Sequence, residues 1–344
     1  MELPARLHQA NIEAITAAVD QELGEHLDIL ARLVAVPGVA WPEYDQQPLE
    51  HGTEIVRELL VASGFPGPAI IRPSVNPDVA GSPGVLASRP AAEGSSTVLL
   101  YAHHDVQPGG PREAWDREPF SAVVKGERLF GRGVADDKAG IVMHLAAIRA
   151  LDRVLGPGHG LGLTVFIEGE EESGSPNLAA LFNQFGQELR ADAAIVADSG
   201  SWTVGTPGLT TSLRGLVDGT LHVRVLEHAL HSGTFGGPVL DALTALARLM
   251  ATFHHDDGSV AVEGLVEARA SGLAIDEDTF RADAGVPDGV RLAGTGTLAS
   301  RLWSKPALSF IGLDAQPIAT AANALLPEAT VKFSPQQALH CHCE

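Results

Sequence analysis

The chain has few cysteines and an excess of acidic over basic residues. Its 344 residues include only two cysteines, Cys341 and Cys343. Two thiols at one end provide no disulfide framework, which agrees with a reducing compartment. Lys and Arg number 23 against 43 Asp and Glu, giving a formal net charge of -20. That charge argues against nucleic acid and anionic membrane surfaces as partners.

Long apolar runs are also lacking. Residues 1–8 contain no apolar signal-peptide core, and no stretch approaches the roughly 20 apolar residues of a membrane span. We therefore expect a cytoplasmic protein. With 45% hydrophobic residues and a mean hydropathy of +0.10, the chain can bury a sizeable core. Its length suggests two domains.

Hydrophobic periodicity indicates the class of fold. Apolar residues at helical spacing over 11–35 predict a helix, and residues 52–62 predict a second one. Strand-like and helix-like segments then alternate, a pattern typical of an α/β sheet. Clusters of Pro and Gly in 66–90 predict turns around short strands, and residues 219–225 alternate like a strand.

Acidic or imidazole side chains follow four apolar runs. They are His103 with Asp105, Asp136, the run Glu170–Glu172, and Asp198. Each has a plainer interpretation by itself: a polar pair, a helix N-cap or a solvated charge run. However, buried charge is costly unless it is paired, and open α/β sheets place ligands at strand ends. Four such places in succession predict a site for two divalent ions.

The ligand types limit the choice of metal and suggest a reaction. Imidazole nitrogen and carboxylate oxygen suit zinc, with manganese or cobalt as alternatives because no cysteine takes part. Neighbouring side chains diverge on an extended segment, so we expect Glu172 to face a metal while Glu171 reaches a water. Glu171 would act as general base and then as general acid to a leaving amine. These residues predict a two-metal hydrolase.

Two motifs resemble those of the M20 family of metallopeptidases, closest to its dipeptidase branch. They are Y-A-H-H-D-V-Q-P at 101–108, with Ala102 in place of the family's Gly, and L-F-G-R-G followed by D-D-K at 129–138. The resemblance implies an α/β fold, in which a mixed-sheet, zinc-peptidase-like catalytic domain carries an inserted smaller α+β lid that mediates dimerisation. It also implies that the substrate is a small peptide.

The resemblance implies a role for each metal-site residue. His103 and Asp198 are expected on one ion and Glu172 on the other, with Asp136 bridging the two. Asp105 is expected to orient His103, and Glu171 to act as the base. The resemblance further implies a cis peptide bond between Asp136 and Asp137.

One further histidine is implied in catalysis. His231 lies in L-H-S-G-T-F-G-G at 230–237, where a lone His before Ser-Gly is ordinarily a turn residue. The resemblance places it on the lid, from which it reaches the partner subunit's active site and stabilises the oxyanion. A homodimer follows. The polar run 254–258 is predicted to be a lid turn without a chemical role.

The resemblance also suggests domain boundaries. We expect a catalytic domain at 1–206, a hinge near 205–208, a lid at 207–334 and an aberrant tail at 335–344. The family's R-L-x-P segment, its Gly-Gly-Ser-Ile-Pro loop and its last metal histidine are not found in this sequence. We therefore expect impaired activity and at most one tightly bound ion. The tail's H-C-H-C run is a weak zinc signal, which we interpret as having no function.

Three functions fit these residues. The motif at 101–108 favours metal-dependent hydrolysis of dipeptides. An N-acyl amino acid amidohydrolase would use the same metal site. The alternative from another class is a non-catalytic, dimerising remnant of such an enzyme.

Overall fold

The chain divides into two compact units, Met1–Leu209 and Thr210–Glu344. The computed structural model describes residues 9–200, 206, 208–210, 213–268 and 272–338. The predicted hinge falls partly, and the H-C-H-C tail entirely, outside the described residues. No helix within the described ranges is both long and apolar enough to cross a membrane.

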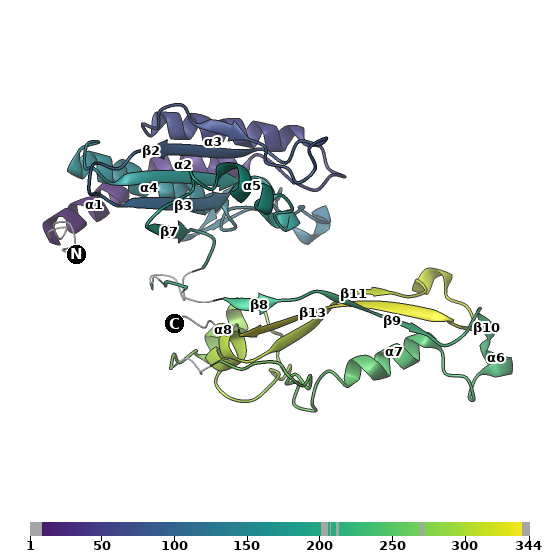
Figure 1. Cartoon of the computed structure of the whole chain (residues 1–344). Helices are drawn as coiled ribbons and strands as arrows, with labels where there is room; N and C mark the ends of the chain where they lie inside the picture. The colour runs from purple at the N-terminus through teal and green to yellow at the C-terminus, as the bar shows by residue number, and fades with distance from the viewer. Residues whose placement is uncertain (1–8, 201–205, 207, 211–212, 269–271, 339–344) are drawn as a thin grey trace. The chain divides into compact units, whose positions relative to one another are not determined.

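The first unit is built on a five-stranded mixed sheet of order β1-β2-β6-β3-β7 (Figure 1). Its strands are β1 (Ala69–Ile71), β2 (Gly84–Arg89), β3 (Thr97–His103), β6 (Gly162–Glu168) and β7 (Ala193–Val196). Strand β3 runs parallel to both β6 and β7, whereas β2 is antiparallel to β6 and to β1. Every residue of β6 is buried, as expected of a strand covered on both faces.

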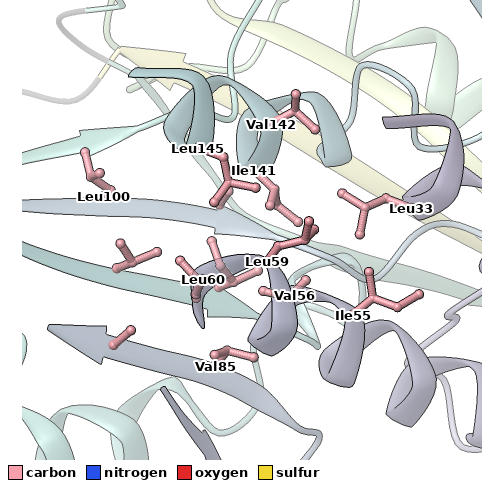
Figure 2. Close-up of a cluster of buried hydrophobic side chains, with 14 of the residues drawn as sticks. Leu33, Ile55, Val56, Leu59, Leu60, Val85, Leu100, Ile141, Val142 and Leu145 are labelled. Atoms are coloured by element: carbon pink, nitrogen blue, oxygen red, sulfur yellow. The ribbon is translucent and has the colours of Figure 1, made fainter. Parts of the chain in front are cut away.

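Helices cover both faces of this sheet. They are α1 (Gln9–Gln21), α2 (Leu23–Val34), α3 (Gln47–Ala62), α4 (Lys138–Leu155) and α5 (Leu178–Phe185). Alternate residues of β6 point to opposite faces. Val165 packs with α2, α3 and α4 in the main core, whereas Phe166 packs with Leu181 of α5. Figure 2 shows the main core, where Leu33, Val56 and Leu145 from the three helices approach the strands.

Two helix predictions needed correction. The single helix predicted over 11–35 is two helices, because the chain leaves helical geometry at Glu22 (φ -99°, ψ 7°), shortly before the poor helix former Gly24. The helix predicted from residue 52 begins at Gln47, since Pro48 is well tolerated in a first turn.

One of the four apolar runs does not end at the sheet. Leu129 and Phe130 belong to β5 (Arg128–Phe130), which pairs only with β4 (Val123–Lys125) in a small hairpin. The prediction that all four runs are comparable strand ends was therefore wrong for this one. Asp136 instead arrives at the start of α4, which is tied to the end of α2 by the buried Lys138. The Lys138 Nζ donates to the carbonyls of Leu33 and Val36 at 2.8 and 2.6 Å.

The second unit contains a separate antiparallel sheet. Its strands are β8 (Arg214–Leu216), β9 (Gly219–Arg224), β11 (Ala307–Asp314) and β13 (Glu328–Ala338), with β13 paired to the other three. The strand predicted at 219–225 is confirmed as β9. Helix α7 (Ala242–Ala251) packs on this sheet through Leu246, which contacts the cluster around Val331.

Smaller elements complete the second unit. They are β10 (Leu230–His231), α6 (Ser232–Phe235), α8 (Glu277–Asp283) and β12 (Ala324–Leu325). The predicted turn at 254–258 is confirmed, because the Gly258 N–H donates to the His255 carbonyl at 2.8 Å.

Candidate metal centre

Three neighbouring parallel strands bring the predicted site residues of the first unit to one edge of its sheet. His103 is the last residue of β3, Glu171 and Glu172 follow β6, and Asp198 follows β7. Carboxyl ends of parallel strands lie together, so these side chains converge. Asp136 joins them from the start of α4.

The His103 imidazole lies at the centre of the group. It is fully buried, and its Nε2 is 3.1 Å from Asp136 Oδ1, 3.8 Å from Glu171 Oε2 and 4.0 Å from Asp198 Oδ2. Burial lowers the pKa of His103, but neighbouring carboxylates, Asp105 first among them, outweigh it and raise the pKa to about 10. The negative potential that favours a proton here also favours a divalent cation.

Donor atoms form two overlapping sets around His103. In one set, His103, Asp136 and Glu172 each offer an atom within 4.8 Å of the others; in the second set, the partners of His103 are Asp137 and Asp198. One imidazole nitrogen with several carboxylate oxygens is a donor set that suits zinc. The residues present therefore fit divalent metal ions.

Asp137 is a member of this site that our reasoning from sequence did not include. Its side chain is fully buried; Oδ2 accepts the His103 backbone N–H at 3.0 Å, and Oδ1 has no hydrogen-bond partner. Burial raises the pKa of Asp137 to about 7. The peptide bond between Asp136 and Asp137 is cis, as the resemblance implied. The only indication in the sequence that Asp137 belongs to the site was the pair of aspartates before Lys138.

The acidic run after β6 is a turn and not the extended segment we predicted. Glu171–Ser173 form one 3₁₀ turn, closed by Gly174 in the left-handed conformation, whose N–H donates to the Glu171 carbonyl at 2.7 Å. The two side chains still separate: Glu171 approaches His103, and Glu172 contacts Gln107. Burial raises the pKa of Glu171, which brings this carboxylate closer to the range useful for a general base.

Asp105 is buried and contacts both the His103 ring and the acidic turn. Its carboxylate lies 3.3 Å from His103 Nδ1. It also accepts the backbone N–H groups of Glu171 at 3.2 Å and Glu172 at 3.0 Å. The sequence predicted the contact with the histidine, whereas the contact with the acidic turn became visible only in the structure.

Two other glutamates stabilise the loop that carries Glu171. The Glu170 carboxylate accepts the Asn177 backbone N–H at 2.9 Å and the Ser82 N–H at 3.3 Å. Glu168 accepts the Tyr101 hydroxyl at 2.7 Å. Both carboxylates are buried and occupied by these bonds, which fix the loop that carries Glu171.

His231 lies in the second unit. It is the last residue of β10, and its ring is exposed, with Nδ1 accepting the Gly233 N–H at 3.1 Å. The other predicted site residues all belong to the first unit.

A mixed α/β sheet that gathers an imidazole and several carboxylates at its strand ends is the arrangement of a metal-dependent hydrolase. Residues 99–338 match the model of Peptidase family M20/M25/M40, and the chain belongs to that family. The resemblance drawn from the motifs is confirmed.

Known relatives support the same assignment. The chain is 38% identical over 242 residues to the cysteinylglycine-S-conjugate dipeptidase of Corynebacterium striatum, covering 69% of this chain and 53% of that protein. It is 31% identical over 271 residues to the Cys-Gly metallodipeptidase dug1 of Schizosaccharomyces pombe, covering 75% and 56%. The chain thus spans about half the length of these relatives.

The fold matches solved structures. The di-peptidase Dug1p from Saccharomyces cerevisiae superposes with a TM-score of 0.76 at 22% identity, covering 96% of this chain and 73% of that one. This likeness confirms the predicted fold class, an α/β unit built on a mixed sheet followed by a smaller second unit.

Proposed function

We propose that this protein hydrolyses the peptide bond of dipeptides with the help of two divalent metal ions, of which one binds tightly and the second more weakly. The observation that carries the proposal is the position of Glu171. Its carboxylate lies 3.8 Å from Nε2 of His103, the residue that both donor sets share, and its backbone N–H donates to Asp105. Relatives named as dipeptidases of Cys-Gly or of cysteinylglycine S-conjugates favour a small dipeptide that begins with cysteine or an S-substituted cysteine as substrate.

The chain's own residues divide the work. We assign His103 and Asp198 to one ion, Glu172 to the other, and Asp136 to a bridge between them, with zinc favoured over manganese or cobalt. When bound, the ions supply Lewis acidity that activates a water molecule and polarises the scissile carbonyl. Glu171 takes a proton from that water and passes it to the leaving amine, so its carboxylate is deprotonated again at the end of the reaction.

We also propose that the protein acts as a homodimer. Residues 1–206 would form the catalytic domain and 207 onward the lid, which includes 335–338 because β13 continues to Ala338 in place of a tail that starts at 335. The lid's His231 would stabilise the oxyanion in the partner subunit's active site. The exposure of His231 supports this role, because a side chain at the surface of its own unit is accessible to a substrate from outside that unit.

The test is hydrolysis of a dipeptide panel by the purified chain, first stripped of metal and then supplied with zinc or manganese. Cys-Gly and β-Ala-His belong in the panel, and N-acetyl amino acids test for deacylase activity. We expect metal-dependent dipeptide cleavage that is lost in Glu171→Gln while metal content is retained. Cleavage that persists without metal, or in Glu171→Gln, would contradict the proposal.

A further inference from the structure

Gln107 forms hydrogen bonds with both the carboxylate and the backbone carbonyl of Glu172. Its side-chain Nε2 lies 2.7 Å from Glu172 Oε2 and 3.2 Å from the Glu172 carbonyl oxygen. Its backbone N–H donates to Glu172 Oε1 at 3.1 Å. We propose that Gln107 is a positioning residue that fixes the Glu172 carboxylate in the orientation needed to hold the second metal ion. This inference rests on the proposed function.

The segment that carries Gln107 is itself firmly placed. Val106 is fully buried, and its N–H donates to the Gly38 carbonyl at 2.9 Å. Gly133 packs so closely that a Cβ there would lie 2.7 Å from Val106 Cγ1. Gln107 therefore extends from a fixed backbone, and its contact with Glu172 is pre-organised.

The chemistry of a neutral amide suits this task. A free glutamate side chain samples many rotamers, and two donors from one residue restrict it. Each carboxylate oxygen has two lone pairs, so an oxygen that accepts from Gln107 can still bind a cation. Because the amide carries no charge, it orients Glu172 without repelling the ion. A positively charged lysine at this position would repel it.

The inference predicts a selective effect. The His103 ring contacts Asp105 through Nδ1 and its backbone N–H donates to Asp137, and neither contact involves Gln107. Loss of the Gln107 amide should therefore weaken the ion assigned to Glu172 and leave the ion assigned to His103 and Asp198 unchanged. A residue needed only for folding would affect both ions alike.

We would titrate the metal-free chain with zinc in competition with a chromophoric chelator. Gln107→Met keeps the length of the side chain and removes its two donations. We expect the second ion to bind ~10–100-fold more weakly, the usual effect of removing a group that orients a metal ligand. The matched control is Gln316→Met, an exposed glutamine of the second unit bonded to Thr320, which should leave both affinities unchanged.

A double variant tests whether Gln107 acts through Glu172. In a Glu172→Gln background, Gln107→Met should weaken the second ion no further, since coupled residues are non-additive. Unchanged affinities in folded Gln107→Met, an equal loss of both ions, or additive effects would overturn the inference alone. A wild-type chain that binds fewer than two ions would instead refute the proposed function, and this inference with it. Thermal unfolding of the metal-free variants checks that each is folded.

Discussion

At the scale of single residues, Asp105 links the buried imidazole of the candidate site to its acidic turn. Its carboxylate contacts the His103 ring and two consecutive backbone N–H groups of the acidic turn. We expect Asp105→Ala to reduce zinc affinity by ~10–100-fold, because the acidic turn loses its carboxylate acceptor and the imidazole keeps only the Asp105 backbone carbonyl, 3.1 Å from its Nδ1. Chelator-competition titration measures this. The exposed Asp116→Ala is the control, and equal affinities in the two variants would count against the assigned role.

His144 makes stability depend on pH. It is buried in α4, and its Nε2–H donates to the Tyr101 carbonyl at 2.9 Å. Burial lowers the pKa of His144 below its ordinary 6.5, so the unfolded chain takes up a proton at a higher pH than the folded one does. This term therefore makes the unfolding free energy fall as the pH drops through about 6.5.

His144→Gln isolates that contribution, since glutamine keeps a donor and does not titrate. Between about pH 7.5 and about pH 5.5, the wild type should lose more unfolding free energy than the variant. Urea unfolding of the metal-free proteins at each pH measures the difference. Parallel stability curves for the two proteins would show that His144 does not contribute.

At the scale of secondary structure elements, replacing a helical glycine by alanine should have opposite effects on stability in α2 and in α4, because only α4 packs closely against the strand ends at its glycine. In α2, a Cβ on Gly24 would meet nothing within 4 Å, so Gly24→Ala should raise stability by about 0.8–1.0 kcal/mol. In α4, a Cβ on Gly140 would lie 2.2 Å from Asp137 Oδ1 and 2.7 Å from the Ala197 carbonyl. Gly140→Ala should lower stability by about 1–3 kcal/mol.

Urea unfolding of the two alanine variants compares these values directly. Because Asp137 has to move, Gly140→Ala should also weaken zinc binding, whereas Gly24→Ala should not. The same sign of stability change in both variants would mean that α4 does not pack against the site as described.

The elements also show why the sequence revealed only part of the site. Continuous apolar runs located β3, β6 and β7, and their polar ends supplied His103 and Asp198. The roles of Asp137 and Gln107 stayed hidden because they depend on contacts across 34 and 65 residues of chain. Such contacts leave no periodic pattern. The turn at Glu171 was missed for a local reason, since Gly174 takes the left-handed conformation and closes a turn where an extended segment after the strand was expected.

At the scale of the whole molecule, the metal ligands and the second sheet belong to different units, so metal should stabilise the two unequally. We expect zinc to bind the folded first unit and not its unfolded form, so free zinc at ~100 times its dissociation constant should add about 2.7 kcal/mol to the unfolding free energy. In calorimetry we expect one transition to move to higher temperature and to return on chelation. Asp136→Asn should show a smaller shift. A transition of the second unit that moves equally would contradict this division.

The proposed dimer leads to a complementation experiment between two inactive variants. His231→Ala should retain its metals and lose activity, and Glu171→Gln should do the same for a different reason. If His231 acts in the partner subunit's active site, a mixed dimer contains one site with both groups intact and one with neither. Random exchange makes half of the dimers mixed, so the mixture should recover about a quarter of wild-type activity. Each variant mixed with itself is the control. A mixture that exchanges subunits and stays inactive would show that His231 serves its own chain.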